Sequence, residues 1–177
     1  MSQISHRILD SQGAGLIIDY GFLSDEKVTD ENKGKLDTFR GYRKHHQVDV
    51  LEFPGETDLT ADVDFDFLAK ALLYDNKLVE GVRLAGPITQ RTWLKNMGID
   101  QRLKNLMAEN KNSEMREKLV RGYEYMTDNE KMGSRFKVMA VVPKGRAEFS
   151  DQLPVTGFHI QDHDKEKGFD ENGCAYK

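Results

Sequence analysis

The chain has 177 residues, 38% of them hydrophobic, and a formal net charge of −4, so we expect one domain or part of one. This acidic balance argues against a nucleic-acid-binding protein, which would need clustered basic residues. A single cysteine, Cys174, excludes an intrachain disulfide, and its surroundings lack the His and Asn of a cysteine nucleophile. The sequence shows no signal peptide, no transit peptide and no apolar run long enough to cross a membrane.

The N-terminal part of the chain alternates helical and strand patterns. Residues 3–11 are predicted to form a short helix that ends at Gly13. The apolar run 14–19 predicts a strand buried on both faces, as found inside a parallel sheet, and it ends in the polar trio Asp-Tyr-Gly. Residues 24–37 are charged and aperiodic, which predicts a solvated loop, while alternation in 47–53 predicts a second strand.

Helical patterns dominate the sequence that follows. A helix with Phe65, Leu68 and Leu72 on one face is expected after the turn at Pro54-Gly55. Further elements are predicted as helices from a Thr89 cap to Gly98, over 100–110 and over 113–126, and as strands over 81–85 and 135–142. Thr127 and Glu130 have the spacing of a capping box, which predicts a helix start there.

Two further features are interpreted structurally. Trp93 and the Met/Tyr stripe of 115–126 fall at helical spacing, which is typical of core residues rather than of a ligand site. The tail 159–177 is polar and is expected to be disordered.

The stretch "GETDLTADVDFDF" concentrates acidic residues and invites a calcium-loop interpretation. That interpretation fails, because an EF-hand needs Gly and Glu at the positions that Phe67 and Leu73 occupy. We expect instead that Asp62 or Asp64 caps the following helix, with Asp66 in its first turn near the positive end of the helix dipole. Helix capping leaves Asp58 and one of the other aspartates unexplained.

Other candidate motifs are weak. Gly13 and Gly15 precede a strand, whereas a nucleotide-binding loop follows one, and no G-x-G-x-x-G sequence occurs, so the chain shows no cofactor loop of its own. The basic segment with Arg40, Tyr42 and Arg43 follows the strand that ends in Asp-Tyr-Gly, where ligands bind in open α/β sheets, and the alternative is that it forms a solvated face. The neighbouring His45-His46 pair, like His159 and His163 in the tail, lacks the supporting ligands of a zinc site, so no metal is predicted.

Five blocks in a fixed order carry a family resemblance: "GLIIDYG", "DTFRGYRKHH", "PGETDLTADVDF", "GPITQRTWLKNMGI" and "KMGSRFKVMAVVP". They resemble the C-terminal half of the MidA-type methyltransferases, which are S-adenosylmethionine-dependent enzymes. The mitochondrial members are protein arginine methyltransferases that act in the assembly of respiratory complex I. The resemblance covers residues 3–158, and its details are closer to the mitochondrial members than to the bacterial ones.

This resemblance implies an α/β fold in which residues 1–158 form the C-terminal part of a Rossmann-like class I methyltransferase sheet with flanking helices. Family members carry a preceding half with a glycine-rich cofactor loop that this sequence lacks. The chain is therefore interpreted as a fragment, a short isoform or a truncated gene model that exposes a sheet edge. The catalytic and cofactor-binding residues of the family cannot be carried over to it.

The implied function is symmetric dimethylation of an arginine on a complex I subunit in the mitochondrial matrix, with S-adenosyl-L-methionine as the cofactor. A guanidinium is charged at any physiological pH, since its pKa is above about 12, and carboxylates can pair with its planar fork. We therefore expect Asp19 and Tyr20 to border the substrate pocket and Asp58 or Asp62 to contact the substrate. Two alternatives remain: a non-catalytic half-enzyme that binds partners, and a methyltransferase of the same fold acting on a small molecule.

Overall fold

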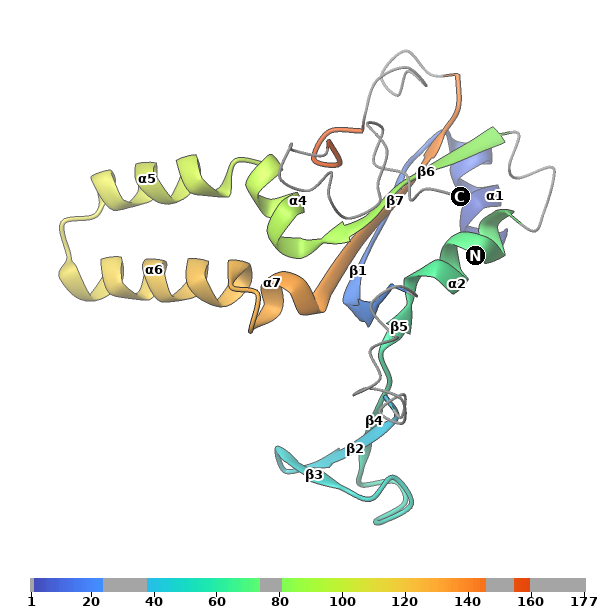
Figure 1. Ribbon diagram of the computed structural model, residues 1–177, viewed down its shortest axis with the longest axis horizontal. Helices are drawn as coiled ribbons and strands as arrows, with labels where there is room; N and C mark the ends of the chain where they lie inside the picture. Colours follow the sequence, from blue (N-terminus) through green and yellow to red (C-terminus); the bar gives the residue numbers. More distant parts are fainter. Residues whose placement is uncertain (1, 24–37, 74–80, 146–154, 160–177) are drawn as a thin grey trace, which may run out of the picture.

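The computed structural model of the chain describes residues 2–23, 38–73, 81–145 and 155–159 (Figure 1). The predicted loop 24–37, His163, Cys174 and the tail beyond residue 159 lie outside the described residues. The elements are α1 (Ser2–Ser11), β1 (Gly15–Phe22), β2 (Arg40–Arg43), β3 (His46–Val48), β4 (Asp58–Thr60), β5 (Val63–Asp64), α2 (Phe65–Leu73), β6 (Val82–Thr89), α4 (Gln90–Asn96), α5 (Ile99–Glu109), α6 (Ser113–Thr127), α7 (Met132–Arg135) and β7 (Phe136–Pro143).

The main sheet has the strand order β5-β1-β7-β6. β7 is antiparallel to both of its neighbours, so β1 and β6 run in the same direction and end at the same edge of the sheet. β5 is parallel to β1 and pairs with it only at Gly21 and Phe22. The predicted α/β class is confirmed, but the expectation that the first strand lies inside a parallel sheet is wrong, because its long neighbour β7 is antiparallel.

The central strand β7 is buried on both faces. On one face Met139 and Val141 pack against α1, α2 and their neighbours, where Ile8 and Phe65 are buried. On the other face Val138 and Ala140 pack against the segment 155–159. An apolar strand without alternation is typical of such a two-sided environment, and here that strand is β7.

β1 is covered on one face only, contrary to the prediction that it is buried on both. Ile17 faces the cluster around Met139 and Phe65, whereas Leu16 and Ile18 point to the opposite face and are 50% and 45% exposed. On the side of β1 away from β7, the described part of the chain adds only the short pairing with β5. The expected open sheet edge is therefore present along most of β1.

The predicted final strand 135–142 and the helices predicted at 3–11, 100–110 and 113–126 are confirmed to within one residue at each end. The strand predicted at 81–85 is longer than expected, since β6 continues to Thr89, and it carries an irregularity in its pairing between Ala85 and Ile88.

A separate antiparallel sheet, ordered β3-β2-β4, lies between β1 and β5 in the sequence. The strand predicted over 47–53 is wrong beyond Val48, because β3 ends there and turns follow. Arg43 pairs with His46 across the two-residue turn Lys44-His45, and both turn residues have positive φ values of 49° and 66°. Two positive φ angles define a type I′ hairpin turn, for which Asn-Gly is the usual sequence signal. Lys44-His45 lacks that signal, so the turn sequence does not predict the hairpin.

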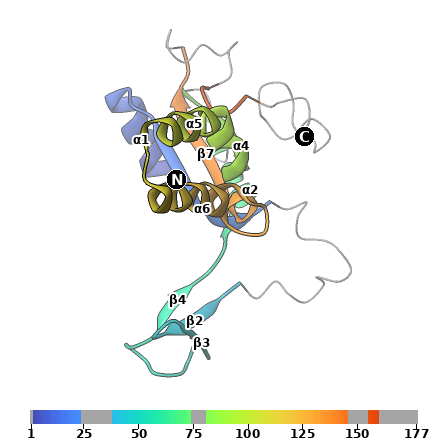
Figure 2. The same ribbon diagram turned by 90° about the vertical axis from the view of Figure 1, so that its left-hand side faces the viewer.

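The helices α4 to α7 follow β6. The Thr89 cap is confirmed, because its side chain accepts a hydrogen bond from the backbone N–H of Thr92, and Gly98 adopts the left-handed conformation (φ 80°) between α4 and α5. The predicted Thr127–Glu130 capping box is wrong, since Thr127 donates to the Tyr123 carbonyl within α6 and α7 begins only at Met132. α5 and α6 run side by side and project away from the main sheet (Figures 1 and 2).

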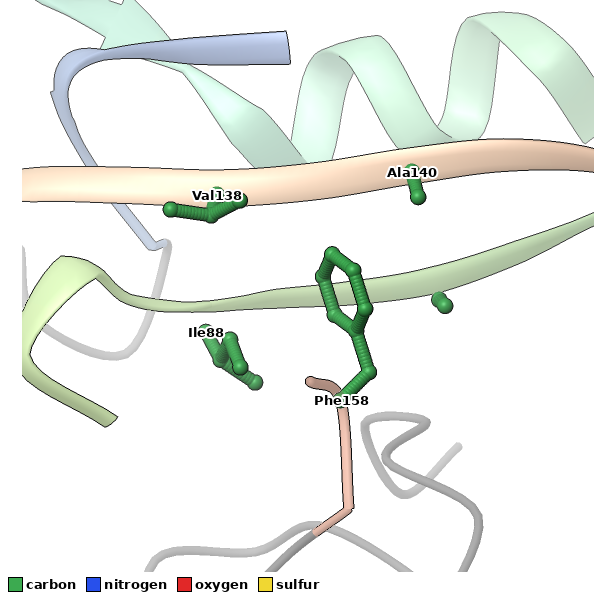
Figure 3. Packing of buried hydrophobic residues seen from close by; sticks show 5 residues of the cluster. Ile88, Val138, Ala140 and Phe158 are labelled. Atoms are coloured by element: carbon green, nitrogen blue, oxygen red, sulfur yellow. The ribbon is translucent and has the colours of Figure 1, made fainter. Parts of the chain in front are cut away.

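A short C-terminal segment completes the fold. Phe158 is 2% exposed, and its ring lies against Ile88 of β6 and Val138 and Ala140 of β7 (Figure 3). Asn96 at the end of α4 fixes this segment by donating to the carbonyl oxygens of Gly157 (2.9 Å) and His159 (2.6 Å). This segment therefore covers the face of the sheet opposite α1 and α2.

Candidate functional site

The aspartates of the stretch "GETDLTADVDFDF" differ in their structural roles. Asp64 caps α2, because its Oδ1 accepts a hydrogen bond from the backbone N–H of Phe67 at 2.9 Å, and Asp66 lies in the first turn as expected. Asp62 instead forms an ion pair with Arg40 of β2. Asp58 lies in β4 with an exposed side chain. Of the two predicted caps, Asp64 is therefore the one observed.

A cavity of about 530 Å³ lies at the carboxyl end of β1, between the small sheet and the segment that joins α6 to β7. In open α/β sheets, ligands bind outside the carboxyl ends of strands, so this position is typical of a binding site. The lining residues come from six elements and the α6–α7 connection: Tyr20, Arg40, Tyr42, Asp58, Thr60, Tyr125, Glu130, Lys131, Met132, Arg135 and Phe136.

The structure brings together two of the four residues predicted from the sequence. Tyr20 and Asp58 both line the cavity, and the Tyr20 hydroxyl is hydrogen-bonded to that of Thr60, which joins the main sheet to the small one. Asp62 does not line the cavity, but it forms an ion pair with Arg40, which does. Asp19 is not a lining residue: it accepts the backbone N–H of Tyr20 at 2.8 Å within β1.

Asp19 lies across the β1–β7 ladder from Lys137, a lysine only 3% exposed. Lys137 Nζ donates to the Ser134 carbonyl oxygen of α7 at 2.6 Å. Burying a lysine requires such polar partners. The sequence does not predict this burial, because no local pattern in the strand around Lys137 distinguishes a buried lysine from an exposed one.

The alternative of a solvated basic face is only partly correct. Arg43 forms an ion pair with Glu56, and its guanidinium carbon lies 4.3 Å from the centre of the Phe53 ring. Both partners lie close to Arg43 in the sequence. Tyr42 contributes to the cavity. His45 lies in the exposed hairpin turn. In the described residues there is no group of three His, Cys, Asp or Glu side chains able to hold a metal ion.

The wall formed by the α6–α7 connection was not predicted. It supplies Tyr125, Glu130, Lys131 and Arg135 to the cavity. The connection is fixed to the start of α4, because Gln90 donates to the Met126 carbonyl (3.0 Å) and Arg91 to the Thr127 carbonyl (2.8 Å). No local pattern links these residues to Asp58, which lies far away in the sequence.

The lining chemistry suits a planar cation. Tyr20 and Phe136 pack edge to face with their ring centres 5.8 Å apart, and Tyr42 and Tyr125 add aromatic surface. Asp58 and Glu130 supply the two carboxylates. A guanidinium stacks on aromatic faces and pairs with carboxylates, so the cavity offers both kinds of contact that an arginine side chain uses.

A second cavity, of about 420 Å³, lies between α4, α5 and α6. Its lining is mainly apolar and includes Trp93, Leu119 and Met126. The stripe of 115–126 was predicted to be core, which is wrong for this part of the chain: it faces α5 across an open groove, and Met115 is exposed. Trp93 does pack against the core cluster around Phe158, as predicted.

Tyr123 lines this groove on the α6 side. Its hydroxyl donates to Asp100 Oδ1 at 2.6 Å. This hydrogen bond, with a smaller contribution from burial, raises the pKa of Tyr123 above its usual value of 10.0. The bond joins α5 to α6 and is a structural feature of the helical pair.

The described residues do not fit the glycine-rich cradle that holds a nucleotide-like cofactor. Such a cradle needs a loop of glycines between a strand and a helix, so that backbone N–H groups face the ligand. At β5–α2 and β6–α4, strand and helix join directly, at Asp64-Phe65 and Thr89-Gln90.

Among the described helices, none has the length and apolar character needed to span a bilayer.

The class of protein follows from the comparison with known families. A family model described as "Putative S-adenosyl-L-methionine-dependent methyltransferase" matches residues 1–82. Two solved structures share the fold. One is an uncharacterised COG1565 superfamily protein from Burkholderia thailandensis (25% identity, TM-score 0.62, 79% of this chain and 36% of that one). The other is a superfamily member from the same organism, bound to S-adenosyl-homocysteine (28% identity, TM-score 0.59, 73% of this chain and 32% of that one).

Curated relatives give a finer assignment. "Protein arginine methyltransferase NDUFAF7, mitochondrial" of Xenopus tropicalis is 39% identical over 158 residues, which are 89% of this chain and 33% of the relative. The human protein of that name is 41% identical over 147 residues, 82% of this chain and 30% of the relative. The chain is thus similar to this family of S-adenosylmethionine-dependent methyltransferases, as the five sequence blocks indicated. It spans about a third of the length of the curated relatives that it matches.

Proposed function

We propose that this chain is the substrate-binding part of an S-adenosylmethionine-dependent protein arginine methyltransferase, and that the cavity at the end of β1 receives the arginine side chain. The observation that carries the proposal is the lining of that cavity, where Asp58 and Glu130 lie among the rings of Tyr20, Tyr42 and Phe136. The names of the relatives, which are arginine methyltransferases, support the same substrate class.

In this proposal the carboxylates of Asp58 and Glu130 hold the guanidinium, and the aromatic rings restrict its orientation. Fixing one nitrogen toward the reacting partner lowers the entropic part of the barrier. Tyr20 has a second role, since its bond to Thr60 holds β4 and therefore Asp58 against the main sheet. The described residues contribute binding and orientation, and they hold no loop for the methyl donor.

We also propose a finer biological assignment. The relatives are named as mitochondrial, which supports a mitochondrial location. The matrix, a subunit of respiratory complex I as the protein substrate and symmetric dimethylation as the outcome are what the family resemblance implies. Methyl incorporation into complex I subunits by the full-length protein, followed by mass spectrometry of the modified arginine, tests this assignment. Incorporation only into a small molecule would contradict it.

The role of the cavity is tested with the variant Asp58→Asn in the full-length protein. Removing one charged hydrogen-bond partner costs about 1.5 kcal/mol at the low end for charged pairs, which is roughly a tenfold weaker binding of the substrate. Glu109→Gln, an exposed carboxylate on α5 outside the cavity, is the matched control. Unchanged methylation by Asp58→Asn, with unchanged stability, would remove Asp58 from the site.

A second candidate function is a non-catalytic module that binds the protein substrate without transferring a methyl group. It is favoured by the direct strand-to-helix junctions, which leave the described residues without a cofactor loop. Isothermal calorimetry of the 177-residue chain with S-adenosylmethionine tests this second function. Tight binding of the cofactor by this chain alone would contradict the non-catalytic module.

A further inference from the structure

Two cations without an ion-pair partner share the cavity with the carboxylates. Lys131 and Arg135 are exposed lining residues, and neither forms a salt bridge with any residue that the structure describes. Arg40, the other lining cation, differs from them because it is paired with Asp62. Lys131 and Arg135 therefore remain available to a ligand.

The charges of the lining explain why these cations matter. With Arg40 compensated by Asp62, the cavity presents Asp58 and Glu130 as anions and Lys131 and Arg135 as cations. An arginine side chain entering alone would gain from the two carboxylates and be repelled by the two cations. A segment that also carries a carboxylate would satisfy both sets of charges.

The two cations are held on a fixed support. Lys131 is the N-cap of α7 and Arg135 is its last residue; the two are four residues apart, so their side chains lie on the same side of the turn. Gly133 between them donates to the Asp128 carbonyl at 2.9 Å, and a Cβ at Gly133 would lie 2.4 Å from the Thr127 carbonyl oxygen. This hydrogen bond and the close approach at Gly133 hold α7 against the end of α6. They therefore fix the position of the backbone that carries Lys131 and Arg135.

We propose that this cavity selects an arginine that has an acidic residue close to it in the same polypeptide. Asp58 and Glu130 bind the guanidinium, while Lys131 and Arg135 bind the neighbouring carboxylate. This inference rests on the proposed function and adds to it a sequence preference of the substrate.

The test is fluorescence anisotropy with four labelled peptides, measured at low ionic strength on the 177-residue chain. The peptides carry arginine or its neutral isostere citrulline, each next to glutamate or glutamine. Exposed ion pairs contribute up to about 1 kcal/mol each, so two cations should make the arginine–glutamate peptide bind roughly fivefold to twentyfold tighter than the arginine–glutamine peptide.

Variants of the chain assign the preference to these residues. The double variant Lys131→Gln/Arg135→Gln should reduce the ratio between the two arginine peptides to about one, whereas Lys104→Gln, an exposed cation on α5 outside the cavity, should leave it unchanged. The double variant Lys131→Glu/Arg135→Glu should reverse the preference, so that the arginine–glutamine peptide binds tighter than the arginine–glutamate peptide. Thermal melts of each variant show whether the fold is retained.

The outcomes separate this inference from the proposed function. Equal binding of the arginine–glutamate and arginine–glutamine peptides by the unaltered chain would overturn the inference and leave the arginine site standing. Equal binding of arginine and citrulline peptides would overturn the proposed function itself, and with it the arginine part of the inference. A preference for glutamate that persists in the Lys131→Gln/Arg135→Gln variant would show that other residues bind the glutamate of the peptide. It would overturn the role assigned to Lys131 and Arg135.

Discussion

Phe158 offers the sharpest test of the fold, because it lies in a segment that the sequence assigned to the domain boundary. Its ring is 2% exposed and packs on β6 and β7 at Ile88, Val138 and Ala140 (Figure 3). A phenylalanine buries about 150–250 Å² of surface, which at about 25 cal/mol per Å² is roughly 4–6 kcal/mol as an upper bound. Phe→Ala substitutions in cores cost about 3–5 kcal/mol, and we expect Phe158→Ala to fall in that range.

This loss is large compared with the about 5–15 kcal/mol that stabilises a typical domain. Urea unfolding measures it, followed both by circular dichroism and by the fluorescence of Trp93, which is the single tryptophan of the chain and packs on the same cluster. Phe158→Leu keeps most of the volume and should lose less than about 1.5 kcal/mol.

The matched control is Phe67→Ala on α2, where the side chain is 66% exposed and the expected change is within about 0.5 kcal/mol. The reasoning would be refuted if Phe158→Ala and Phe67→Ala gave the same unfolding free energy. In that case the segment 155–159 would not belong to the core, and Asn96 would hold it only at the surface.

Three further predictions concern single contacts. Asp64→Ala should lower the unfolding free energy by about 1 kcal/mol through loss of the α2 cap, while Asp64→Ser should retain most of it; equal losses in the two would contradict capping. Arg40 and Asp62, 19% and 21% exposed, should show a coupling energy of about 1.5–3 kcal/mol in a double-mutant cycle of unfolding free energies, and a value near zero would show that the pair adds no stability. Because its bond to Asp100 raises the pKa of Tyr123, the stabilisation by that bond should be complete below about pH 10, the unfolded pKa, and should be lost as the pH rises through the higher folded pKa. Tyr123→Phe should remove this part of the alkaline loss in a series of urea melts, and an unchanged slope would contradict it.

Local patterns in the sequence determined much of this protein. The ends of α4 follow from Thr89 and Gly98, and β7 follows from a valine-rich apolar run, because caps and periodicity act over a few residues. The five ordered blocks likewise carried the family without any knowledge of contacts. Of the residues that line the candidate site, the sequence singled out Tyr20 by its place at a strand end and Asp58 by its place in an acidic segment, and their role in binding substrate stays a prediction.

Only the tertiary structure decided which residues meet. The hairpin at Lys44-His45 forms without the usual turn residues, because pairing of β2 with both β3 and β4 outweighs the local preference. No pattern in the sequence predicts that Glu130 and Asp58 line the same cavity, since the contacts that position the α6–α7 connection come from α4. Capping patterns act within one turn, whereas a binding cavity depends on contacts between residues far apart in the chain, and those contacts are set by how the elements pack.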